Sequence, residues 1–199
     1  MEKKVFREIL SCDKKVFEQY IQEFRSKLLL QITNDHIILI RKYIVLLRYC
    51  QYYKEKYEEG NKFAIISYIF YAKRMNALGN RLGFYISPSA KIGKGFWIYH
   101  HGAVIINGNV RIGEFCRLHG SNCIGNGGIN NHGAPIIGNN CDIGFGAVII
   151  GNITISDNTT VGANAVVNKN FNEPNVILAG VPAIMKGKNN EVKHYCTNI

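Results

Sequence analysis

The chain has 199 residues, of which 47% are hydrophobic, so it is long enough for one full domain with a buried core and a smaller appendage. Its formal net charge is +10, yet no RNP, zinc-finger or helix-turn-helix signature accompanies that charge, so we expect a basic surface for anionic ligands and no nucleic-acid partner. The most apolar run, residues 63–72, has about half the length needed to span a bilayer, which argues against stable membrane insertion.

The six cysteines are scattered along the chain without a C-x-x-C pair, and no apolar leader stands at the N-terminus. Cysteines in such a pattern are expected to be reduced thiols rather than a disulfide framework. The sequence therefore predicts a cytoplasmic protein.

The composition changes near residue 82, because all but two of the 20 glycines and all four prolines follow that point. Before it, apolar side chains recur every three to four positions, which predicts helices over residues 14–32, 36–57 and 61–78, the first capped by Asp13. We therefore predict an α-helical N-terminal domain over residues 1–82.

A six-residue repeat of aliphatic side chains follows, and it predicts the fold of the second region. Fixed-period repetition indicates stacked units, each too small to bury its own apolar face. Six residues form one flat side and three sides form one coil, so the repeat predicts a parallel β-helix over residues 83–185, followed by a C-terminal tail over residues 186–199. The chain is then mainly β, with an α-helical N-terminal region. The repeating positions are Ile86, Ile92, Ile98, Ile106, Ile112, Leu118, Ile124, Ile137, Ile143, Ile149, Ile155, Val161 and Val167.

Two breaks in this repeat contain histidine. One interval of eight residues, between positions 98 and 106, includes His100, and one of thirteen, between positions 124 and 137, includes His132. Insertions leave the stack of a solenoid as loops, and such loops often carry function. The two breaks are therefore the best indication of an active site within the repeat.

A neutral imidazole can take a proton from a hydroxyl near neutral pH and return it to a leaving thiolate, as acyl transfer requires. We predict that His100 is the catalytic base. Backbone N–H groups of the glycine-rich residues 125–128 are candidates for stabilising an oxyanion. The remaining histidines are either secondary candidates (His132, His101 and His119) or, outside the repeat, interpreted as structural or exposed (His36 and His194).

The segments ISPSAKIGKGFWIYHHGAVI, IGNNCDIGFGAVIIGNITISDNTTVGANAVV and AGVPAIMKGK give the chain a resemblance to the hexapeptide-repeat acyltransferases over residues 83–188, and among them to the serine acetyltransferase-like branch. The resemblance implies a left-handed β-helix that uses acetyl-CoA as co-substrate. It also implies a homotrimer in which two subunits share each groove, with the helical region as a candidate surface for pairing two trimers into a hexamer.

Carried over residue by residue, the resemblance aligns His100 with the family's catalytic histidine. It also implies two sets of coenzyme A contacts. Backbone atoms make the first set, at Gly125, Asn126, Phe145, Gly146, Ala147 and Ala163. Basic side chains near the phosphates or adenosine make the second set, at Lys169 and Lys186.

Three departures from the serine acetyltransferase pattern concern the acceptor. Tyr85 and Tyr99 stand where the family has aspartates near the catalytic histidine, and the arginine that grips the serine carboxylate is missing from residues 131–135. Without a bidentate cation, recognition of free serine loses its main anchor. We therefore expect a sugar hydroxyl as acceptor, as in the similar acetyltransferases that modify capsular, O-antigen or exopolysaccharide units. Candidates for orienting His100 or for packing on a pyranose ring are Tyr85, Tyr99 and Trp97, with ordinary coil-surface aromatics as the competing interpretation.

Other functions stay open on the sequence alone. Serine O-acetylation is the main alternative, and the terminal Ile199 matches the isoleucine with which serine acetyltransferases commonly dock a partner enzyme. A zinc-dependent carbonic-anhydrase-like enzyme would use His101 and His119, but the two-residue insertion spoils their stacking, so we expect no metal. A non-enzymatic scaffold would leave the histidine-bearing breaks unexplained.

Overall fold

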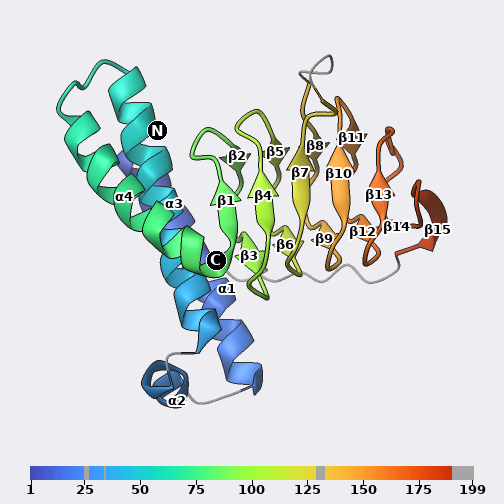
Figure 1. Ribbon diagram of the computed structural model, residues 1–199, viewed down its shortest axis with the longest axis horizontal. Coiled ribbons are helices and arrows are strands. Elements are labelled where there is room, and N and C mark those ends of the chain that lie inside the picture. The colour runs from blue at the N-terminus through green and yellow to red at the C-terminus, as the bar shows by residue number, and fades with distance from the viewer. Residues whose placement is uncertain (25–26, 34, 129–132, 190–199) are drawn as a thin grey trace.

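A computed structural model describes residues 1–24, 27–33, 35–128 and 133–189 of the chain. In these residues a helical region precedes a solenoid of short strands (Figure 1). The helices are α1 (Lys3–Phe24), α2 (Lys27–Ile32), α3 (His36–Glu58) and α4 (Ala64–Leu82). None of the helices among the described residues is both long enough and apolar enough to cross a membrane.

The strands form three sheets that run side by side as the faces of a prism, confirming the predicted parallel β-helix with an α-helical N-terminal region. We name them sheets A, B and C in the order in which the chain visits them. Sheet A contains β1 (Phe84–Ile86), β4 (Val104–Ile106), β7 (Cys123–Gly125), β10 (Val148–Ile150) and β13 (Val166–Val167). Sheet B contains β2 (Lys91–Ile92), β5 (Arg111–Ile112), β8 (Ile136–Ile137) and β11 (Thr154–Ile155). Sheet C contains β3 (Trp97–Ile98), β6 (Arg117–Leu118), β9 (Asp142–Ile143), β12 (Thr160–Val161), β14 (Val176–Ala179) and β15 (Ile184–Lys188), of which β15 alone among the described strands pairs antiparallel.

The repeating aliphatic residues fill the interior of the prism. In sheet A, Ile106 pairs in register with Ile124, which pairs with Ile149, and all three are fully buried. Each such side chain contributes about 1.5–3 kcal/mol by leaving water. Because every coil adds one buried residue on each side, the six-residue repeat is the physical reason for the fold.

The first helix is longer than the sequence pattern predicts. It begins at Lys3, so Asp13 lies inside α1, and the prediction that Asp13 caps a helix starting at residue 14 is wrong. Phe6 is buried and stacks on Tyr52 of α3, with ring centroids 4.4 Å apart. The charged residues around Phe6 hide this apolar contact from a periodicity analysis. Asp35, in contrast, does cap a helix, because its side chain accepts a hydrogen bond from the backbone N–H of Ile37 at the start of α3.

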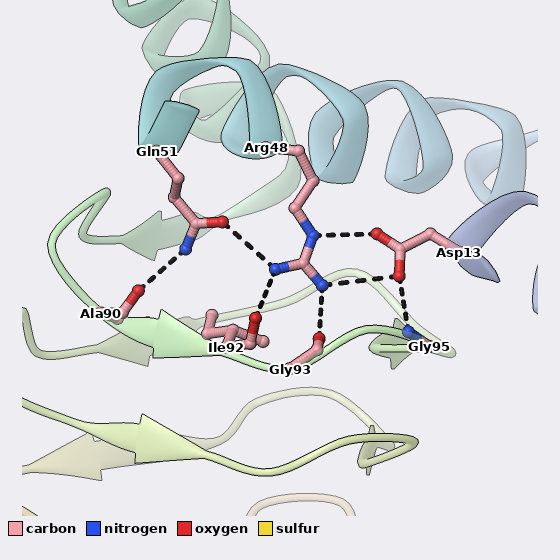
Figure 2. Close-up of polar contacts among 7 residues, drawn as sticks. All are labelled: Asp13, Arg48, Gln51, Ala90, Ile92, Gly93 and Gly95. Carbon is pink, nitrogen blue, oxygen red and sulfur yellow. Dashed lines mark hydrogen bonds and ion pairs between the residues drawn. The ribbon is translucent and has the colours of Figure 1, made fainter. Parts of the chain in front are cut away.

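A buried polar network joins the helical region to the first coil (Figure 2). Arg48 of α3, only 2% exposed, donates to the Asp13 carboxylate at 2.9 Å and to the carbonyl oxygens of Ile92 and Gly93 at 2.7 and 2.6 Å. The Asp13 carboxylate also accepts from the backbone N–H of Gly95 at 2.7 Å. These contacts satisfy polar groups at the exposed end of the solenoid, where no further coil supplies partners. We name this network the Asp13–Arg48 junction.

Candidate active site

His100 lies in the corner where the chain passes from β3 in sheet C to β4 in sheet A, a line along the prism that we name the C–A edge. The corner is two residues longer than the repeat requires, and Gly102 turns the chain at φ 132°, a conformation that favours glycine. The backbone N–H of Gly102 donates to the carbonyl of Leu82 at 2.9 Å, which fixes the corner against the end of α4. His100 and His101 are thereby held exposed at the surface.

The helical region supplies a second imidazole beside His100. His36, the first residue of α3, lies with its ring centroid 6.1 Å from that of His100 and 5.4 Å from that of His101. Its Nδ1 is 3.1 Å from a carboxylate oxygen of Asp35. From the sequence, His36 is interpreted as structural or exposed, and this proximity is not predicted. An aspartate before the apolar run at 37–40 indicates a helix start, but no local signal places that start beside residue 100.

This environment favours the neutral form of His100. Partial burial lowers its pKa below the ordinary value of 6.5, and repulsion from His36, His119 and His101 in their charged forms lowers it further. A neutral imidazole can accept a proton, as a general base must. A cavity of about 200 Å³ opens beside the ring, lined by Tyr20, Ile21, Leu30, Asp35, His36, Ile37 and His100.

The structure changes the role expected for Trp97. It is only 2% exposed and packs between Phe17 and Tyr20 of α1, with ring centroids 5.6 and 5.8 Å away. The expectation that Trp97 presents a face to a pyranose ring is therefore not met in this structure. The sequence could not reveal the helix that covers it, and Trp97 instead anchors α1 on the first coil.

Tyr99 lies between the two histidines of successive coils. Its ring centroid is 6.5 Å from that of His100, 4.8 Å from that of His119 and 5.3 Å from that of Tyr20. His119 in turn places Nε2 at 2.8 Å from a carboxylate oxygen of Asp142 in β9. A carboxylate partner of this kind fixes the orientation and tautomer of an imidazole. From the sequence, His119 is a secondary candidate, and no pattern there identifies Asp142 as its partner.

Of three further predicted residues, one lies apart from this group and two lie outside the described residues. Tyr85 is 73% exposed on the outer face of sheet A, and its side chain makes no hydrogen bond or ring contact with the described residues. His132 lies outside the described residues, as does the terminal Ile199. Over the described part of the chain, no group of three or more His, Cys, Asp or Glu side chains is arranged to hold a metal ion.

Half of the predicted coenzyme A residues lie along the C–A edge below His100. Gly120 lies directly under His100, since a Cβ built on it would be 3.0 Å from the His100 carbonyl oxygen. The next two coils continue the line, because the N–H of Gly146 donates to Gly120 and that of Asn164 donates to Phe145, at 3.0 and 2.8 Å. This edge therefore carries Phe145, Gly146, Ala147 and Ala163.

The other half lies elsewhere on the same chain. Gly125 ends β7 and is followed by Asn126, where the chain leaves sheet A for sheet B, a line that we name the A–B edge. Lys169 follows β13 on the same edge, with its Nζ 5.6 Å from the ring centre of Phe171. Lys186 is exposed on β15. Sheet A, one full side of the prism, separates Gly125, Asn126 and Lys169 from the C–A edge, whereas Lys186 lies in sheet C.

Comparisons with known proteins place the fold. No protein-family model and no curated protein sequence matches the chain. Similar solved structures include a serine acetyltransferase from Brucella abortus in complex with coenzyme A, which is 21% identical with a TM-score of 0.72, over 94% of this chain and 70% of that one. The serine acetyltransferase of Neisseria gonorrhoeae is 21% identical with a TM-score of 0.66, over 94% and 71% of the two chains. The soybean serine acetyltransferase apoenzyme is 25% identical with a TM-score of 0.57, and this chain spans 70% of its own length and 55% of the soybean chain. The left-handed β-helix implied by the sequence resemblance is confirmed as the fold.

Proposed function

We propose that the chain is an acetyl-CoA-dependent O-acetyltransferase in which residues 83–185 carry the reaction and His100 is the general base. The observation that carries the proposal is the position of His100, exposed and biased to its neutral form, at the head of the C–A edge. Four of the eight residues predicted to contact coenzyme A follow along that edge, and one structural neighbour is a complex with coenzyme A.

In this proposal His100 takes the proton of the acceptor hydroxyl while the hydroxyl oxygen attacks the thioester carbonyl of acetyl-CoA. The new C–O bond forms, the C–S bond breaks, and His100 returns the proton to the leaving thiolate. Backbone N–H groups near Gly125 of the neighbouring chain, in the trimer described below, stabilise the negative charge on the carbonyl oxygen. The products are the O-acetyl ester and free coenzyme A.

A trimer would bring the two edges together. The outer face of sheet A carries an in-register column of side chains without charge, formed by Tyr85, Ile105, Cys123, Val148 and Val166. If sheet A faces the threefold axis, both of its edges touch neighbours, so the C–A edge of one chain faces the A–B edge of the next. Lys169 of the neighbour then adds a cation for the phosphates of coenzyme A. Pairing of two such trimers into a hexamer belongs to the same proposal.

We propose a sugar hydroxyl of a capsule, O-antigen or exopolysaccharide unit as the acceptor, because residues 131–135 contain no arginine for a carboxylate. Free serine is the second candidate. It is favoured by the neighbours, which include a soybean serine acetyltransferase complexed with serine.

The five described cysteines are all free thiols, which supports a reducing compartment and hence the cytoplasm.

The experiment measures thiol release from acetyl-CoA with a panel of mono- and oligosaccharides and, separately, with L-serine. We expect release with a saccharide and none with serine. His100→Asn should lower kcat by about 100-fold or more while coenzyme A binding, measured by calorimetry, is unchanged. Release with serine alone would select the second candidate, and full activity of His100→Asn would rule out this residue as the base.

A further inference from the structure

The outer face of α4 exposes a stripe of large apolar side chains. Phe63, directly before the helix, and Ile66, Ile69 and Phe70 are between 54% and 83% exposed. Their spacing places them on one side of the helix, opposite the buried residues Ala64, Met75, Gly79 and Leu82. In Figure 1 the N-terminal part of α4, which carries the stripe, lies at the outer margin of the helical region away from the β-helix, and the C-terminal end of the helix reaches β1. Exposed contiguous apolar side chains of this size mark an interaction surface.

The charge around this stripe has a single sign. α4 contains Lys73, Arg74 and Arg81 and no acidic residue, and the sequence has no Asp or Glu anywhere between Gly60 and Gly113. Within the part of the chain that the structure describes, none of these three cations forms an ion pair. A helix with an apolar stripe and only basic charge is typical of segments that lie on a membrane surface.

A groove beside the stripe continues the same chemistry. It has a volume of about 640 Å³, and its lining contains four basic residues and no acidic one. The guanidinium of Arg41 lies over the Phe17 ring at 4.4 Å, and that of Arg74 lies over the Phe70 ring at 5.4 Å, so Arg74 belongs to both groove and stripe. The remaining lining is largely apolar. The groove is formed by Phe17, Gln31, Ile38, Arg41, Lys42, Val45, Leu46, Arg74, Ala77, Leu78 and Arg81.

We propose that the α4 stripe and the adjoining groove together form a docking surface for an anionic lipid bilayer. The four groove cations, which include Arg74 and Arg81, contact the phosphate groups of the lipids. The aromatic and aliphatic side chains of the stripe enter the boundary between headgroups and acyl chains. The helix lies in the plane of the interface and does not span the bilayer. This surface is separate from the C–A edge and does not depend on the proposed acyl transfer.

A second copy of the chain is the competing occupant, and the charges oppose it. A twofold contact pairs the same patch on both subunits, so Lys73, Arg74 and Arg81 of one copy would face the same cations of the other. An anionic surface neutralises them instead. The proposed trimer, when it is not paired into a hexamer through its helical ends, would also present three copies of the patch from one end of the prism, and simultaneous attachment would strengthen binding.

Flotation with vesicles tests the proposal on the full chain. We expect binding to vesicles of phosphatidylglycerol and phosphatidylcholine and none to vesicles of phosphatidylcholine alone. The double variant Arg74→Gln/Arg81→Gln should weaken binding about 30-fold, from about fivefold for each cation removed. The matched control Lys4→Gln/Lys15→Gln removes the same amount of charge from two exposed positions of α1. These positions lie on the side of α1 opposite Phe17, which lines the groove. The control should therefore change binding less than about threefold.

A fluorescent reporter tests insertion of the stripe. The chain has one tryptophan, the buried Trp97, so Phe70→Trp adds a single exposed indole. Its emission should shift to shorter wavelength with the anionic vesicles and stay unchanged with phosphatidylcholine alone. Equal loss of binding in both double variants, or an unshifted emission, would overturn the proposal. So would reversible self-association in sedimentation that Phe70→Ala abolishes, with no vesicle binding, because that result assigns the face to a second copy.

Discussion

Replacing Arg48 by methionine should detach the helical region from the β-helix. The substitution keeps most of the apolar stem and removes the guanidinium that bridges Asp13 to the carbonyl oxygens of Ile92 and Gly93. The carboxylate of Asp13 then stays buried without a cation. Since both partners are less than a tenth exposed, solvent screens this loss only weakly.

The magnitude follows from the groups left without partners. Removing one member of a buried ion pair costs about 3–5 kcal/mol, and each buried carbonyl that loses its donor costs about 1–3 kcal/mol. The two costs overlap, and Asp13 retains the N–H of Gly95 at 2.7 Å, so we expect a total near 4 kcal/mol. At a typical urea slope this corresponds to a midpoint roughly 2 M lower. The double variant Asp13→Asn/Arg48→Met should cost less than the sum of the two single variants.

Urea unfolding followed by two probes separates the junction from the solenoid. The fluorescence of Trp97, which packs between the first coil and α1, reports on docking, whereas far-UV circular dichroism reports on all elements. In Arg48→Met the fluorescence transition should precede the dichroism transition. Lys54→Met on the same helix, which removes only the surface pair with Glu58, should cost less than about 1 kcal/mol. A fluorescence midpoint in Arg48→Met equal to that of Lys54→Met would refute the role assigned to the junction.

Three further predictions follow from single residues. His36→Asn removes a charge that lowers the pKa of His100, so the His100 titration by NMR and the acidic limb of kcat/KM should both move to higher pH; an unmoved titration would contradict this. Gly79→Ala places a Cβ 2.6 Å from the backbone carbonyl that begins β1 and should cost about 1–3 kcal/mol in thermal unfolding, whereas Gly187→Ala, with open space around it, should cost less than about 0.5 kcal/mol. Among the described cysteines Cys123 alone is not buried within one chain, but it lies in the sheet A column that faces the threefold axis of the proposed trimer; peptide mapping after brief iodoacetamide treatment should therefore find it protected like the four buried cysteines, and faster alkylation of Cys123 would contradict that packing.

The β-helix could be predicted from the sequence because its determinant is local and repeated. A polar residue at Ile106 would remove one buried aliphatic position. The six-residue spacing of the other positions would still predict the same fold. The helices follow a weaker rule. Their contacts with the coil, such as that of Arg48 with Ile92, join residues far apart in sequence, and no periodicity encodes them. For the same reason, periodicity alone does not predict that α1 begins at Lys3.

In the candidate site, too, the features with a local sequence signal could be predicted and those that depend on tertiary packing could not. The corner containing His100 could be located because an insertion in a regular array is visible in the sequence. The neighbours of His100 from the helical region could not, because His36 and Tyr20 reach the corner only through tertiary packing. Trp97 illustrates the opposite error, since a residue that looks available on a coil surface is covered by α1.

The separation of the coenzyme A residues over two edges leads to a last prediction about assembly. Gly151 lies directly under Gly125, because its N–H donates to the Gly125 carbonyl at 3.0 Å, and Phe145 lies six residues before Gly151, on the neighbouring edge. In one chain the two edges are therefore separated by the full width of sheet A. If each groove combines the C–A edge of one chain with the A–B edge of the next, His100→Asn and Asn126→Trp chains, each inactive alone, should regain about a quarter of wild-type activity when refolded together as mixed trimers. If a single chain forms the whole groove, the mixture stays inactive, and the proposed sharing between subunits is wrong.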